Sequence, residues 1–257
     1  MFEQLITEFS ALKEVEAIAL GGSRAGGHFD HTSDYDVYLY CTGPIAESVR
    51  RNILTRYCRV LEIGNHYWEL EDNCILNNGI DIDILYRNLD DFSSDVASVV
   101  EHYQARNGYT TCMWHNLLTC RILYDPHGRL AATKAQFDIP YPKQLQANII
   151  GRNFQLLHTA MPAYRVQIEK AVKRQDLVSI QHRVTAFMES YFDILFAVNK
   201  KTHPGEKRLI QLCKESCPIL PENFEVNLEA LFRHLYTAPE QINADISALI
   251  ENLSKIL

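Results

Sequence analysis

The sequence lacks the features that mark membrane and secreted proteins. In its 257 residues no window approaches the roughly 18 uncharged apolar residues that a membrane helix needs. Its start, Met-Phe-Glu-Gln, has neither the basic n-region nor the apolar h-region of a signal peptide. Seven cysteines are scattered without a repeated short spacing, which excludes an evident disulfide framework or zinc knuckle. A cytoplasmic protein without membrane contact is therefore expected.

Positive charge is also scarce. The chain has 25 Lys and Arg against 32 Asp and Glu, a formal charge of −7, and it contains no block of basic residues. Proteins that hold nucleic acid need such a block for their phosphate contacts. A nucleic-acid partner is thus disfavoured, and a small-molecule or protein substrate is favoured.

The periodicity of apolar residues divides the chain into two halves. Up to about residue 140 it changes repeatedly between helical and strand spacing, and beyond Pro140 and Pro142 it is helical almost throughout, with a break at Pro162. We therefore expect an α+β domain over residues 1–140 and an all-α helical bundle over 141–257. Strands are predicted at 16–20, 35–40, 58–63, 66–71 and 80–86, and helices at 2–12, 45–57, 89–103 and 176–199. Thr237 and Glu240 have the spacing of a capping box before a last helix.

Two pairs of carboxylates follow strand spacing. Asp34 and Asp36 open the predicted strand at 35–40, and Asp81 and Asp83 lie on one face of the strand at 80–86, whose other face is apolar. Residues two apart on a strand point the same way, roughly 7 Å apart. Without a cation, carboxylates about 5 Å apart repel by roughly 3 kcal/mol. Mg²⁺ is the natural counter-ion, because hard cations prefer oxygen ligands.

A Gly-Gly-Ser turn precedes the first carboxylate pair. Two Mg²⁺ ions could hold a triphosphate and stabilise the leaving oxygen of an in-line displacement, and small residues at Gly22 and Ser23 would let the backbone approach that triphosphate. Other readings of the glycines fail. The Lys-Ser/Thr of a P-loop is absent after Gly26, and a serine-hydrolase elbow would need a helix where the sequence favours a loop.

The order of strand, Gly-Gly-Ser, about ten residues, Asp-x-Asp and a later carboxylate strand resembles the polymerase-β-like nucleotidyltransferase superfamily. It is most similar to small bacterial members of the aminoglycoside and lincosamide nucleotidyltransferase type, over about residues 15–90. A second stretch, Glu189–Asn199 followed by His203–Arg208, is similar to the helical C-terminal domain of uncharacterised bacterial nucleotidyltransferase-like proteins. The resemblance implies a mixed sheet followed by a helical bundle, with the active cleft between them.

Carried over by residue, the resemblance implies that Gly22 and Ser23 contact the triphosphate and that Asp34 and Asp36 bind both metal ions. It implies Asp83 as third carboxylate, metal ligand and general base, with Asp81 as the alternative. Two cations complete the expected nucleotide site: Arg24 beside the turn, as a phosphate clamp, and Lys207 from the bundle, with a solvated helix start as the alternative for Lys207.

The expected reaction transfers a nucleoside monophosphate from a nucleoside triphosphate, ATP by preference, to a hydroxyl and releases pyrophosphate, with two Mg²⁺ ions or Mn²⁺ as cofactors. The acidic charge favours a small hydroxylated cation as acceptor, and Trp68, Glu69 and Glu71 are candidates to line its pocket. Alternatives are transfer of AMP to a protein hydroxyl and a non-catalytic module that binds nucleotide or, like an antitoxin, a partner protein. A metal-independent binding domain would require the carboxylate cluster to be accidental.

Overall fold

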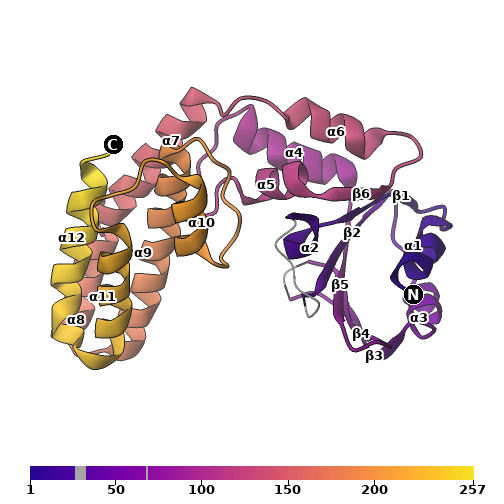
Figure 1. Ribbon diagram of the computed structural model, residues 1–257, viewed down its shortest axis with the longest axis horizontal. Coiled ribbons are helices and arrows are strands. Elements are labelled where there is room, and N and C mark those ends of the chain that lie inside the picture. Colours follow the sequence, from indigo (N-terminus) through magenta and orange to yellow (C-terminus); the bar gives the residue numbers. More distant parts are fainter. Residues whose placement is uncertain (27–32, 68) are drawn as a thin grey trace. The chain divides into compact units, whose positions relative to one another are not determined.

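The computed structural model describes residues 1–26, 33–67 and 69–257 (Figure 1). They form two compact units, each described separately below. The sheet unit consists of Met1–Ala97 and Asn116–Ile139, and the helical unit of Ser98–His115 and Pro140–Leu257. The sequence predicted a single boundary after residue 140. The structure differs from this prediction in one respect: Ser98–His115 precedes residue 140 in the sequence but belongs to the helical unit.

The sheet unit contains a mixed six-stranded sheet, which confirms the predicted α+β class. Among the described residues its strands follow the order β3-β4-β5-β2-β1-β6, in which β2 and β5 are parallel and the other neighbours are antiparallel. The strands are β1 (Val15–Leu20), β2 (Tyr35–Cys41), β3 (Cys58–Asn65), β4 (Glu71–Leu76), β5 (Asp81–Arg87) and β6 (Arg121–Tyr124).

Helices α1 (Phe2–Ser10) and α3 (Glu47–Leu54) cover one face of this sheet (Figure 1). Leu5 and Phe9 of α1 are fully buried there, together with Leu39 of β2 and Ile82 of β5. Every second residue of the central strands points into this core, so the residues between them point to the opposite face. That opposite face carries Asp36 and Asp83.

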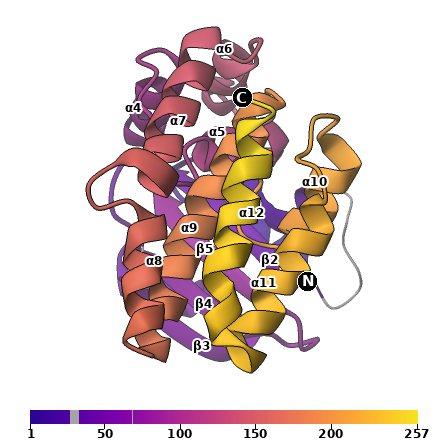
Figure 2. The ribbon, with the colours of Figure 1, turned by 90° about the vertical axis from the view of Figure 1, so that its left-hand side faces the viewer.

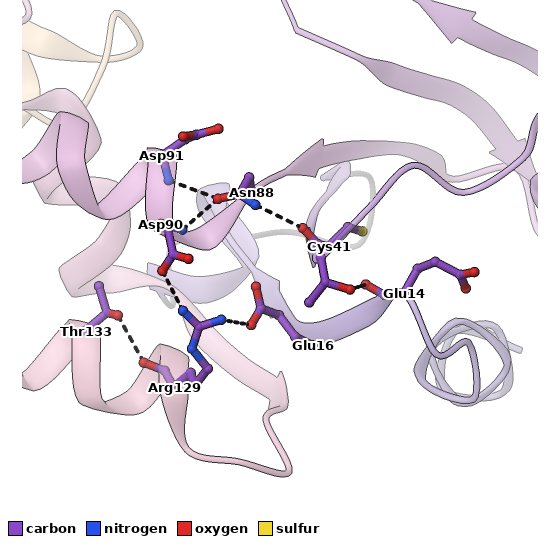
Figure 3. A network of polar contacts seen from close by, with 9 residues as sticks. Glu14, Glu16, Cys41, Asn88, Asp90, Asp91, Arg129 and Thr133 are labelled. Atoms are coloured by element: carbon purple, nitrogen blue, oxygen red, sulfur yellow. Dashed lines mark hydrogen bonds and ion pairs between the residues drawn. The ribbon is translucent and has the colours of Figure 1, made fainter.

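A polar network joins the ends of the sheet to the helices beside it (Figure 3). Arg129, at the start of α6 (Arg129–Phe137), forms ion pairs with Glu16 of β1 and Asp90 of α4 (Leu89–Val100). Asn88 caps α4, since its Oδ1 accepts hydrogen bonds from the backbone N–H groups of Asp90 (2.9 Å) and Asp91 (3.0 Å). The network fixes α4 and α6 against β1.

The helical unit is built around α9 (Leu177–Val198). Helices α8 (Tyr164–Lys173), α9, α11 (Phe224–Thr237) and α12 (Ile242–Ser254) lie side by side as a bundle (Figures 1 and 2). Nearly every residue in the second half of α9 is buried, and Phe187, Tyr191 and Leu195 are fully so. The unit also contains α7 (Lys143–Phe154), a π-helical turn that continues it (Gln155–Thr159) and α10 (Leu209–Ser216), with α5 (Cys112–Thr119) at the boundary.

Buried polar contacts explain why Ser98–His115 belongs to the helical unit. Asp193 of α9 is 1% exposed and accepts hydrogen bonds from the backbone N–H (3.0 Å) and hydroxyl (2.6 Å) of Thr110. Asn153 of α7 donates to the same carboxyl (3.1 Å) and accepts from the N–H of Gly108 (3.1 Å). Burial raises the pKa of Asp193 to about 6.

Three sequence predictions of local structure are wrong. The strand expected at 66–71 lies later, at Glu71–Leu76. The segment after Gly21, expected as a loop, begins with a short helix, α2 (Gly22–Gly26). Thr237 is not a cap, because its hydroxyl donates to the carbonyl of Arg233 inside α11 (2.9 Å) and a short 3₁₀ turn follows at Pro239–Gln241. Among the helices that the structure describes, none is long and apolar enough to span a bilayer.

Candidate functional site

Two of the predicted site carboxylates stand next to each other on parallel strands. In the register of β2 and β5, Asp36 is opposite Asp83, and both lie near the amino ends of their strands on the face away from α1 and α3. Paired residues on neighbouring strands are about 5 Å apart. At an effective dielectric constant near 20, two negative charges at this spacing repel by about 3 kcal/mol. The arrangement therefore favours a cation between the two side chains.

The register also distinguishes Asp83 from Asp81. Asp81 is exposed at the first position of β5, one position before the paired region with β2 begins at Ile82. Asp34 is exposed and precedes β2, which starts at Tyr35. The structure thus brings Asp36 and Asp83 together directly, and places Asp34 and Asp81 at the entry of the two strands.

Gly22 passes directly over one of these carboxylates. Its φ is +61°, and a Cβ atom at this position would stand 1.8 Å from Oδ2 of Asp36. The preceding residue, Gly21, donates its backbone N–H to the carbonyl of Asp36 (2.8 Å). Only glycine combines this backbone conformation with so close an approach. Consequently the Gly-Gly-Ser segment and Asp36 form one structural unit, with Ser23 exposed beside them.

A side-chain relay orients Asp83 from the other side. Asn73 of β4 lies opposite Asp83 and donates its Nδ2 to Oδ1 of that carboxylate (2.8 Å). The Oδ1 of Asn73 in turn accepts from Nδ2 of Asn65 in β3 (2.6 Å). The amide of Asn73 thus occupies one oxygen of Asp83, and the amide of Asn65 holds Asn73 in that orientation. Neither asparagine was predicted as a site residue, because an asparagine in a strand gives no sequence signal of what its side chain contacts.

Glu71 adds a further acid to this face. It is 9% exposed at the start of β4, and its pKa is raised, first by burial and then by the charge of Asp83. A raised pKa means that the surroundings disfavour another negative charge. The negative charge of Glu71 is therefore unfavourable in this acidic cluster, because the side chain is buried and lies near Asp83.

Arg24 contacts the chain that leads into β2. Its Nε donates to the carbonyl oxygens of Ser33 (2.7 Å) and Asp34 (3.2 Å), and its guanidinium lies 4.0 Å from the centre of the Tyr35 ring. These contacts hold the segment that carries Asp34 and Asp36. Contact of Arg24 with phosphate stays a prediction.

Further along the same face of the sheet, Arg87 of β5 forms an ion pair with Glu69. Its Nε and Nη2 each lie 2.7 Å from a carboxylate oxygen of Glu69, and its guanidinium lies 4.2 Å from the centre of the Tyr38 ring. Burial acts to lower the pKa of Arg87, but the bonds to Glu69 outweigh it and leave that pKa raised. The charge of Glu69 is thus compensated, which removes it from the free acids expected to attract a cationic acceptor.

The other predicted residues are not gathered at this point. Within the described ranges 1–26, 33–67 and 69–257, no three His, Cys, Asp or Glu side chains meet in an arrangement that could hold a metal ion. Lys207 is exposed in the turn before α10 of the helical unit, and its contact with nucleotide stays a prediction. Trp68 lies outside the described residues.

Comparison with known proteins gives a family without an assigned activity and several similar solved structures, including the following two. The family described as "Domain of unknown function (DUF4037)" matches residues 109–209, less than half of the chain. No curated protein matches. A nucleotidyltransferase-like protein from Exiguobacterium sibiricum 255-15 is 11% identical, with a TM-score of 0.45, over 100% of this chain and 74% of that one. An aminoglycoside 6-adenyltransferase from Bacillus subtilis is 10% identical, with a TM-score of 0.28, over 100% and 89%.

Both solved structures carry names that agree with the resemblance found in the sequence. Superpositions this loose and identities this low carry no argument about activity.

Proposed function

We propose that the protein is a nucleotidyltransferase that transfers a nucleoside monophosphate, by preference AMP from ATP, to a hydroxyl of a small acceptor and releases pyrophosphate. The observation that carries the proposal is the joint placement of Gly22, Asp36 and Asp83. A glycine backbone lies directly over one carboxylate, and that carboxylate is in register with a second one on the neighbouring parallel strand. A structural turn beside solvated acids would require neither feature.

The carboxylates have the chemistry that Mg²⁺ requires. Asp36 and Asp83 offer hard oxygen ligands, and Asn73 holds one oxygen of Asp83 in a fixed direction. Asp34, two residues before Asp36, is the third ligand of the proposal; in the described residues its side chain does not meet the other two, so it must turn toward them when the ion binds. When bound, Mg²⁺ would neutralise the phosphates and stabilise the leaving pyrophosphate oxygen.

The residues beside the paired strands β2 and β5 then have separate roles. The absent side chain of Gly22 leaves room for the carboxylate of Asp36, so that the backbone beside that carboxylate can approach a phosphate, and the exposed hydroxyl of Ser23 donates a hydrogen bond to this phosphate. Arg24 keeps Asp34 in place through its backbone carbonyl. Asp83 accepts the proton of the acceptor hydroxyl through the oxygen that Asn73 leaves available.

Calorimetric titration with Mn²⁺ and ATP tests this proposal without knowledge of the acceptor. Asp36→Asn should abolish metal-dependent ATP binding, while the thermal midpoint stays the same or rises because a like-charge repulsion is relieved. Asp91→Asn, an exposed acid at the start of α4, is the matched control for loss of one charge. If Asp36→Asn lowers the thermal midpoint and binds ATP like the wild type, Asp36 is structural and the proposal fails.

A second comparison asks which acid completes the site. Asp83→Asn should weaken metal-dependent ATP binding far more than Asp81→Asn, because only Asp83 is in register with Asp36. A screen of pyrophosphate release with Mg²⁺ and hydroxylated acceptors then separates an enzyme from a module that only binds nucleotide. Binding without any release across that screen would favour the module.

A further inference from the structure

A pocket of about 310 Å³ lies within the helical unit. It is bounded by α9, α10, α11 and the segment that contains Tyr109; Figure 2 locates the three helices. Its volume is roughly ten times the share of one water molecule in the liquid, at the lower end of the range for small-ligand sites. Apolar and aromatic side chains line most of it: Val184, Met188, Phe192, Leu209, Ile210 and Phe232.

The charges in this pocket have one sign. Glu189 of α9 and Glu206 before α10 contribute carboxylates, and no Lys or Arg is among the lining residues. Across the part of the chain that the structure describes, no ion pair or side-chain hydrogen bond is found for either carboxylate. The pKa of Glu189 is raised by burial, and that of Tyr109 by burial and by both carboxylates. Among the residues that line the pocket, the charge of these two carboxylates is therefore uncompensated.

Aromatic rings reinforce this preference. Tyr109, Phe192 and Phe232 all line the pocket. The faces of such rings attract ammonium groups, most strongly where water is excluded. A bare metal ion would need about six oxygen ligands, which these walls do not supply.

The wall that carries Tyr109 is firmly built. Gly108 has a φ of +88°, and a Cβ atom there would stand 2.7 Å from Cβ of Glu189. The same segment is bonded to Asn153 and Asp193 through Gly108 and Thr110. Tyr109 and Glu189 are consequently held next to each other by backbone packing that a change at the Glu189 carboxyl does not touch.

We propose that this pocket binds an organic ammonium ion with an apolar or aromatic body, its charge held by Glu189 and Glu206 and its body by the aromatic walls. The binding is independent of nucleotide transfer. It requires only residues of the helical unit.

Calorimetry on the full chain with 2-phenylethylammonium tests the proposal, and 2-phenylethanol serves as the neutral probe of the same shape. The ammonium should bind saturably and at least tenfold more tightly than the alcohol. Glu189→Gln should weaken ammonium binding about tenfold, the effect of losing one charge-assisted hydrogen bond. Thr185→Trp, which adds bulk at an exposed lining position, should abolish binding of both probes.

Two controls decide the interpretation. Glu222→Gln removes an exposed carboxylate of the helical unit that does not line the pocket, and it should leave binding unchanged. Asp36→Asn should also leave it unchanged, so that failure here and failure of the proposed transferase site remain distinguishable. Absence of saturable binding, equal affinity for the alcohol, or equal effects of Glu189→Gln and Glu222→Gln would each overturn the proposal.

Discussion

Replacing Gly22 by alanine tests the central contact of the candidate site. The substitution has two costs. Alanine at a φ of +61° costs about 1 kcal/mol relative to glycine. Its Cβ would also stand 1.8 Å from Oδ2 of Asp36, so the carboxylate or the backbone must move, and overpacking of this kind typically costs 1 to 3 kcal/mol more. Gly22→Ala should therefore destabilise the protein by about 2 to 4 kcal/mol.

Gly128→Ala is the matched control. Gly128 has a φ of +67°, and an added Cβ would meet nothing within 4 Å, so this variant has the backbone cost alone, about 1 kcal/mol. Urea denaturation measures both free energies of unfolding, and calorimetry measures metal-dependent ATP binding. We expect only Gly22→Ala to lose ATP binding, because only there is Asp36 displaced. Equal destabilisation by the two variants, with ATP binding retained by Gly22→Ala, would refute the reasoning.

Three further predictions concern single side chains. Ser23→Ala should weaken metal-dependent ATP binding about tenfold, through loss of one hydrogen bond to charged phosphate. Wild-type affinity of this variant would mean that Ser23 does not contact the phosphate. Asp193→Asn should change the pH dependence of stability. The native carboxyl keeps its proton up to about pH 6 and the unfolded one only to about pH 4, so the wild type loses about 3 kcal/mol relative to the variant between pH 4 and 7. A constant difference in urea denaturation over that range would contradict this. Glu69→Gln should destabilise the protein by about 3 kcal/mol because it leaves the buried Arg87 guanidinium without its carboxylate, whereas Glu47→Gln, which breaks an exposed pair with Arg51, should cost under about 0.5 kcal/mol.

Long periodic segments could be predicted from the sequence, and elements defined by a distant partner could not. The apolar periodicity of α9 placed the helix at 176–199, close to its observed bounds of Leu177–Val198. Strand β4 was misplaced because it begins with Glu71-Asp72-Asn73, which does not look like a strand. Asp72 is nevertheless fully buried, paired with Arg50 and bonded to Tyr86 (2.7 Å). These partners, distant in sequence, stabilise the buried Asp72 in the polar first half of β4.

The site shows the same division. Strand alternation correctly placed Asp83 on the face opposite the apolar residues of β5. The glycines were predicted to approach a triphosphate, which stays a prediction, and the close approach of Gly22 to Asp36 was not foreseen. The sequence did not reveal that Asn73 and Asn65 hold Asp83, or that Arg87 neutralises Glu69, because neither relation has a fixed spacing along the chain. Register and pairing between strands determine these contacts.

The excursion of Ser98–His115 into the helical unit has a consequence for synthesis on the ribosome. Thr110 emerges 83 residues before its partner Asp193. At 5 to 20 residues per second, Thr110 waits roughly 4 to 17 seconds for that carboxyl to be made. During this interval β6, at Arg121–Tyr124, becomes available to complete the sheet beside β1. If the chain folds as it is synthesised, the sheet unit would form first. Ser98–His115 would then stay without its partners until the helices of the helical unit are synthesised and pack against it.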